Sequence, residues 1–170
     1  MSMTAVEMLI RYNSWTTGVL IDEAAKLAPE EYHQQFEIGL GSVHDTLRHI
    51  VGAMLRWADR ISGRPLRDSI ESGEPLPPAR LRELLAQADA ELREAAAVAE
   101  SHGWDSEIEF PREGGPRYHF TRLAAMLHAL THGTHHRAQV LNMRRQLGLP
   151  ALGLDLDVVE WECMTTGQLG

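Results

Sequence analysis

The chain has 170 residues, of which 44% are hydrophobic and 24% charged, and its formal net charge is −8. This length supports one domain with a real core and is too short for two, so we expect a single domain over residues 1–170. Lys26 is the only lysine, and no basic run is present. Binding to nucleic acid depends on clustered Lys and Arg that neutralise phosphates. The composition therefore argues against a nucleic-acid partner.

The cysteine content and the length of the apolar runs indicate in which cellular compartment the protein is expected. Cys163 is the only cysteine, which excludes an intrachain disulfide and a zinc cluster built from thiolates. The first residues lack the basic-then-apolar pattern of a signal peptide. No uncharged apolar run approaches the ~20 residues that span a bilayer. We therefore expect a soluble cytoplasmic protein without a membrane partner.

The first half of the chain shows two segments with helical periodicity. The first opens at Thr4, where Glu7 completes a capping box, and Pro29 is expected to end it. The second is capped by Ser42 and stopped by Gly63, and its apolar positions recur every three to four residues. The apolar residues of this second stripe are Leu47, Val51, Met54, Ala58 and Ile61.

The second half of the chain predicts two more helices. One begins at Pro77 or Pro78, which suit a first turn, and runs to Gly103. The other is capped by Thr121 and runs to Gly148. Because the helices on either side look like packing partners, residues 63–78 are interpreted as a crossover loop.

Irregular segments complete the chain. Residues 104–118 hold one strand-like piece, Glu107–Phe110, and the two glycines within 113–115 predict a turn. The segment 149–161 is expected to pack as a loop followed by a short terminal turn. Four long helices with two longer connections predict an all-α fold, a four-helix bundle with a long crossover connection.

The strongest functional signal is a pair of histidines in the fourth helix. His132 and His136 are four residues apart, so their side chains lie on one face and can approach one ion. His128 continues the spacing, but it lies about 12 Å from His136 along the axis and cannot share that ion. A third ligand must come from another element. The remaining candidates are His33, His44, His49, His102 and His119.

A helical wheel selects His49 as the third ligand. His132, His136 and Gln139 share a face with Ala125, Ala129 and Met143, opposite a stripe of Leu123, Leu127 and Leu130. His49 shares a face with Asp45, Gly52 and Ala53, opposite the Leu47 stripe. Two faces of small and polar residues that meet would leave a cavity with polar groups pointing into it, as a small-molecule site requires.

These motifs carry a family resemblance. The segment Ser42-Val-His-Asp-Thr-Leu-Arg-His-Ile50 followed by Trp57, together with residues 128–139 and the tail through Asp155, resembles the DinB/YfiT-like superfamily. The resemblance implies a four-helix bundle, a homodimer and a divalent metal held by three histidines. Carried over by position, the ligands are His49, His132 and His136. Ala138 departs from the glycine that the family often has before its glutamine.

The other reactive side chains have simpler interpretations. His33, His44 and His102 are expected to be structural, since no second ligand pairs with them. His135 faces away from the pair and is expected at the surface or beside the ligands, and His128 is expected to pack or to hydrogen-bond near the site. Cys163 has no accompanying base and is expected to be inert.

The residues between the paired histidines restrict the chemistry. A zincin has a glutamate inside its HExxH motif, whereas this chain has Gly133, Thr134 and His135. Asp45 and Gln139 are the nearest polar companions and suit orientation of the ligands. Without a general base, activation of a thiol is favoured over activation of water. Zinc or nickel is the expected metal, with iron or manganese as alternatives.

The resemblance implies a metal-dependent S-transferase that uses a low-molecular-weight thiol and a small-molecule substrate. A metal-dependent hydrolase is the alternative enzyme. A stress-related metal- or ligand-binding protein without turnover is a further alternative, and a helical interaction module with incidental histidines is another.

Overall fold

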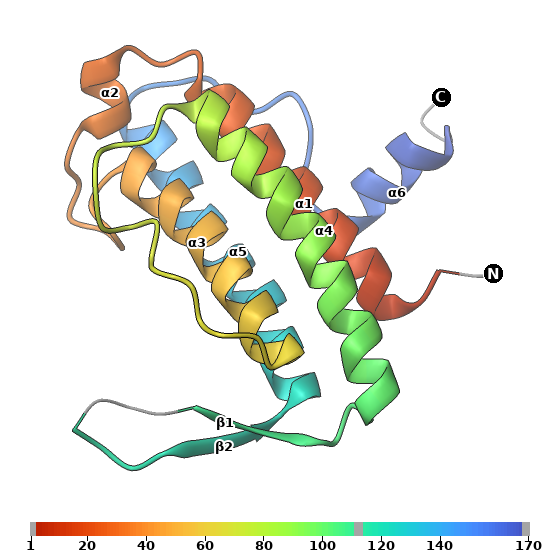
Figure 1. The fold of residues 1–170 in the computed structure, drawn as a ribbon. Helices are drawn as coiled ribbons and strands as arrows, with labels where there is room; N and C mark the ends of the chain where they lie inside the picture. The colour runs from red at the N-terminus through yellow and green to blue at the C-terminus, as the bar shows by residue number, and fades with distance from the viewer. Residues whose placement is uncertain (1–2, 111–113, 168–170) are drawn as a thin grey trace.

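A computed structural model describes residues 3–110 and 114–167 and has eight elements in chain order (Figure 1). The elements are α1 (Ala5–Ala24), α2 (Pro29–His33), α3 (Val43–Ser62), α4 (Pro78–His102), β1 (Glu107–Phe110), β2 (Tyr118–Thr121), α5 (Arg122–Gln146) and α6 (Val158–Thr166). The long helices α1, α3, α4 and α5 lie alongside one another and form the bundle. The expected all-α four-helix bundle is therefore confirmed.

Side-chain caps fix three of the long helices at the predicted residues. The Thr4 hydroxyl accepts a hydrogen bond from the Glu7 N–H at 3.1 Å, and Ser42 accepts one from Asp45 at 2.9 Å. Thr121 accepts one from the Ala124 N–H at 3.1 Å. Each bond satisfies a backbone donor that has no partner inside the helix.

Helix ends differ from the prediction where proline was interpreted only as a terminator. Helix α1 ends at Ala24, and Pro29 instead starts the short helix α2. Proline suits the first turn because its missing N–H would be unpaired there anyway. Glu31 supports this start by accepting a hydrogen bond from the Ala28 N–H at 2.9 Å. Helix α5 ends at Gln146, two residues before the expected Gly148.

The irregular segments are more ordered than predicted. The strand expected at Glu107–Phe110 is confirmed, and it pairs antiparallel with β2, which was not predicted. The expected turn at 113–115 lies partly outside the described residues. The terminal turn is the nine-residue helix α6, which Asp157 caps through the Glu160 N–H at 2.7 Å.

The core confirms one predicted stripe and corrects the other. Leu47, Val51 and Met54 of α3 are at most 1% exposed. In α5, however, Leu127 is 43% exposed whereas Leu130 is 5% exposed, so only part of the predicted leucine stripe faces the bundle. The buried face of α5 instead includes small residues such as Ala125, Ala129 and Gly133. The histidine face of α5 therefore faces into the bundle.

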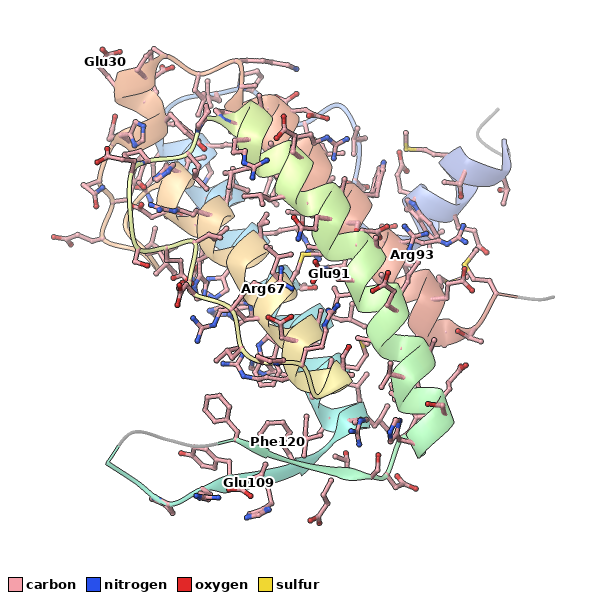
Figure 2. The ribbon with its side chains drawn as sticks, viewed as in Figure 1. Glu30, Arg67, Glu91, Arg93, Glu109 and Phe120 are labelled. Carbon is pink, nitrogen blue, oxygen red and sulfur yellow. The ribbon has the colours of Figure 1, made fainter. Side chains whose placement is uncertain are left out.

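The crossover between α3 and α4 is held by ionic contacts. Arg67 forms two hydrogen bonds of 2.7 Å with the buried carboxylate of Asp59 and also pairs with Glu91 of α4, which lies beside it in Figure 2. Arg48 of α3 donates to the Gly73 carbonyl at 3.2 Å. These contacts hold residues 63–77 against α3. Within the described ranges, no helix is both long and apolar enough to cross a membrane.

Candidate metal centre

Three histidines from two helices converge at one point. His49 lies on α3, and His132 and His136 lie one turn apart on α5. The Nε2 atom of His132 is 3.0 Å from Nε2 of His49 and 3.1 Å from Nε2 of His136. His136 is 9% exposed, and the other two are partly buried. The structure thus brings together the three residues that the sequence selected.

Each outer histidine is oriented through its other ring nitrogen. The Nδ1 of His49 lies 2.9 Å from a carboxylate oxygen of Glu71, and the Nδ1 of His136 lies 2.8 Å from Oε1 of Gln139. Both partners are acceptors, so each Nδ1 carries the proton and each Nε2 keeps a lone pair. The predicted orienting role of Gln139 therefore has a structural basis.

Whether a cation fits between the three histidines depends on how many of their facing ring nitrogens present a lone pair. In the neutral cluster, only His132 can carry a proton on Nε2, and it can donate that proton to one neighbour at a time. The three nitrogens therefore present more acceptors than donors. Ligand bonds of ~2.0–2.1 Å at tetrahedral angles place nitrogens about 3.3 Å apart. The observed separations of 3.0 and 3.1 Å are close to that value, so the donor set fits a divalent ion.

Burial favours the neutral, ligating form of the two α5 histidines. Burial, followed by the neighbouring His136 and His49, lowers the pKa of His132 to about 3. Burial also lowers the pKa of His136, although its hydrogen bond to Gln139 acts in the opposite direction. A histidine must be in its neutral form to ligate a metal, so near neutral pH no second, charging proton has to be removed from these rings.

Glu71 is the functional residue that sequence reasoning missed. It lies on the crossover loop, 22 residues after His49, and no local pattern signals its contact. Gly52 allows the approach, because a Cβ atom there would lie 3.0 Å from the Ile70 side chain and 3.5 Å from Glu71. Because Gly52 has no side chain, the crossover loop packs closely enough against α3 for the Glu71 carboxylate to reach His49.

Two more histidines, His135 and His128, lie beside the cluster and contact residues that surround it. His135 is exposed, and its Nε2 lies 3.1 Å from the side-chain nitrogen of Gln139, as expected for a residue next to a ligand. His128 packs against Trp57, with ring centroids 4.7 Å apart, and its centroid is 5.5 Å from that of His132. The packing role expected for His128 is therefore observed.

The remaining histidines lie elsewhere. His44 is 2% exposed, and its Nε2 accepts a hydrogen bond of 3.1 Å from the Leu76 N–H. Its ring also packs near those of His33 and Tyr32. His102 lies in the last turn of α4, with Nδ1 3.0 Å from the Val98 carbonyl. These positions agree with structural roles.

Asp45 and Cys163 do not contribute contacts to the centre. The carboxylate of Asp45 hydrogen-bonds Ser42 at 2.7 Å and His44 at 2.8 Å, so it does not orient His49 as the helical wheel suggested. Asp45 sits in the first turn of α3, where its hydrogen-bond partners are the Ser42 hydroxyl and the adjacent His44 ring. Cys163 is a free cysteine on α6, outside the elements that carry the three histidines.

The fold and the cluster define an all-α bundle with a three-histidine site able to hold a metal ion. The chain belongs to the DinB family, whose sequence model matches residues 1–167. Protein DinB of Bacillus subtilis (strain 168) is 26% identical over 155 residues, which cover 86% of this chain and 88% of that protein.

Two solved structures share the fold. A DinB-like protein from Bacillus cereus ATCC 10987 has a TM-score of 0.62 and 18% identity, covering 85% of this chain and 92% of that one. A protein assigned to the DinB family from Exiguobacterium sibiricum 255-15 has a TM-score of 0.63 and 22% identity, covering 92% of this chain and all of that one.

Proposed function

We propose that His49, His132 and His136 bind one divalent metal ion through their Nε2 atoms, and that the protein is a metal-dependent enzyme. One observation carries the proposal: Glu71 and Gln139 direct two Nε2 lone pairs toward a third ring nitrogen at 3.0 and 3.1 Å. Zinc or nickel is the expected ion, with iron or manganese as alternatives. Three ligands leave at least one coordination position for substrate or water.

We further propose that the reaction is transfer of a low-molecular-weight thiol to an electrophilic carbon. A bound divalent ion would stabilise the thiolate form of such a thiol near neutral pH. The sulfur forms a bond to carbon, the leaving group departs with its electron pair, and the thiol proton passes to solvent. Glu71 and Gln139 keep the histidine rings in place. Glu71 accepts the Nδ1 proton of His49 through one carboxylate oxygen, which suits orientation of that ring.

Metal content tests the first part of the proposal. The purified protein loaded with zinc should hold one equivalent by elemental analysis, and a His49→Ala/His132→Ala variant should hold none while it stays helical by circular dichroism. His102→Ala is the matched control, since that histidine lies in the last turn of α4. Equal metal content in all three proteins, or none in any, would refute the site.

Turnover tests the second part. Metal-loaded protein is assayed with 1-chloro-2,4-dinitrobenzene and glutathione, bacillithiol or mycothiol, beside the metal-free double variant. Thiol-dependent product only in the loaded protein supports the transferase. Ester or amide hydrolysis without a thiol would favour the hydrolase. Stoichiometric metal without turnover in any of these assays would favour a binding protein.

A homodimer is proposed from the outer face of α5. Six uncharged residues on this face are exposed and recur every three or four positions, a pattern that suits helix–helix packing between copies. They are Ala124, Leu127, Thr131, Thr134, Ala138 and Leu141. A buried interface would also account for the 43% exposed Leu127 on an otherwise well-packed helix.

A further inference from the structure

A second candidate site lies between the end of α3 and the β-hairpin. A cavity of about 460 Å³ is present there, with arginines on the α3 side and aromatic and aliphatic side chains on the hairpin side. The aromatic residues are Phe110 and Phe120, and Figure 2 shows Phe120 on the hairpin below the end of α3. The walls therefore combine positive charge with apolar surface.

Two of the three arginines have no carboxylate partner within residues 3–110 and 114–167. Arg56 and Arg60 lie one turn apart on α3, and Arg64 directly follows Gly63, the residue that caps the end of this helix. Arg64 pairs with Glu91 at 3.2 Å and with Asp59 at 3.5 Å. The side chain of Arg56 forms no hydrogen bond or ion pair with any residue that the structure describes, and neither does the side chain of Arg60.

The Arg60 guanidinium is held in place by rings rather than by acceptors. It lies 4.7 Å from the centroid of the Trp57 ring and 4.6 Å from that of Phe110, within range of cation–π attraction. Its Nε is buried and finds no hydrogen-bond acceptor among the described residues. A buried donor without an acceptor costs free energy, and an anion in the cavity would add negative charge beside this guanidinium.

Among the described residues, one carboxylate lines the cavity, and it is already engaged. Glu109 lines the cavity and pairs with Arg117 across the hairpin. The cavity thus has a local surplus of positive charge in a chain whose formal net charge is −8. Such a surplus favours a small anion, because guanidinium groups hydrogen-bond carboxylates strongly.

The cavity is connected to the three histidines by packed rings. Arg60 lies over Trp57, Trp57 contacts His128 at 4.7 Å between centroids, and His128 is 5.5 Å from His132. Along α3, Arg56 follows His49 by seven residues, which is about 10 Å at 1.5 Å per residue. An acid held by Arg56 would therefore lie about 10 Å along α3 from His49, and the contacting rings of Trp57 and His128 lie between the cavity and His132.

We propose that Arg56 and Arg60, with Phe110 and Phe120, bind the carboxylate end of an organic acid with an apolar body. We identify this acid as the electrophilic substrate of the three-histidine centre. The identification as substrate rests on the proposed function, whereas binding of the carboxylate does not.

The test measures binding of 2-naphthoate by calorimetry, with 2-naphthamide as the uncharged ligand of the same shape. The His49→Ala/His132→Ala background, stripped of metal, prevents the carboxylate from binding an ion. We expect 2-naphthoate to bind at least about tenfold more tightly than the amide, the loss typical of removing a charged hydrogen-bond partner. No detectable binding of 2-naphthoate, or equal binding of both ligands, would overturn the proposal.

Arg56→Glu is the decisive variant, because Arg56 has no described contact that holds the fold. It should weaken 2-naphthoate binding by at least about tenfold and leave the amide unchanged. Arg80→Glu, the same charge change on α4, should leave both unchanged. Equal affinities in the Arg56 and Arg80 variants would refute the assignment. Arg60→Gln is a second variant, with near-ultraviolet circular dichroism to check that the stacked hairpin is retained.

The metal proposal and the carboxylate proposal can fail separately. Carboxylate binding in the metal-free background, with no metal uptake by the wild-type protein, would leave the carboxylate site and remove the metal centre. Metal uptake without carboxylate selectivity would do the reverse. If both stand, 2-naphthoate should act as a competitive inhibitor of turnover in the metal-loaded wild type, and a noncompetitive pattern would separate the cavity from the substrate site.

Discussion

Removal of the Glu71 carboxylate should weaken metal binding even though Glu71 is not a ligand. Glu71 accepts from Nδ1 of His49 at 2.9 Å, which fixes the ring and leaves Nε2 free for the ion. Losing such a partner typically costs 10–100-fold in metal affinity. The Glu71 side chain is 38% exposed, so water can replace part of the interaction. For Glu71→Ala we therefore expect about a tenfold rise in the zinc dissociation constant, or ~1.4 kcal/mol.

Competition with a chromogenic chelator measures this constant, and two further variants identify its cause. Glu71→Gln keeps an acceptor oxygen but removes the charge, so its loss of affinity should be smaller than that of Glu71→Ala. Glu74→Ala removes the same charge from the same loop, and Glu74 has no hydrogen bond or ion pair with the described residues. If Glu71→Ala and Glu74→Ala bind zinc equally well, the orienting role of Glu71 is refuted.

Three further predictions concern stability and assembly. Burial lowers the pKa of His44, so the unfolded chain binds a proton more readily than the folded one. The free energy of unfolding should therefore fall as the pH drops below about 6.5, and it should fall less in His44→Gln. Urea unfolding of the two metal-free proteins at pH 7 and pH 5 measures the difference. An equal fall in both would contradict the role of His44. Gly133→Ala would place a Cβ atom against Asn13 and should lower the free energy of unfolding by about 1–2 kcal/mol, whereas Gly153→Ala, with open space around it, should change it by under ~0.5 kcal/mol. Leu127→Glu should convert a dimer to a folded monomer in light scattering, and an unchanged dimer would place the interface elsewhere.

Local chemistry made much of the fold predictable. The caps at Thr4, Ser42 and Thr121 depend on residues within three positions, so the sequence contains the whole interaction. The pairing of His132 with His136 is equally local, because one helical turn sets their separation. His49 required the comparison of two helix faces and was supported by a family resemblance.

Features that depend on tertiary contacts were missed or misplaced. The position of Glu71 depends on how the crossover loop packs over Gly52, and nothing near residue 71 encodes that path. Leu127 was predicted in the core because large aliphatic residues usually lie there. In α5, close packing instead buries small residues such as Ala129 and exposes the leucine. Helix α2 was missed because Pro29 was interpreted as an end when it is a start.

The placement of the histidines on two helices has a consequence for folding itself. His49 and His132 are separated by 83 positions, so an ion bound to both would act as a reversible cross-link between distant parts of the chain. A permanent cross-link closing a loop of this size reduces the entropy of the unfolded chain by the equivalent of about 4–5 kcal/mol. An ion that binds the folded chain alone stabilises it in proportion to the logarithm of its concentration. The lifetime of this protein in a cell would then follow the supply of its metal.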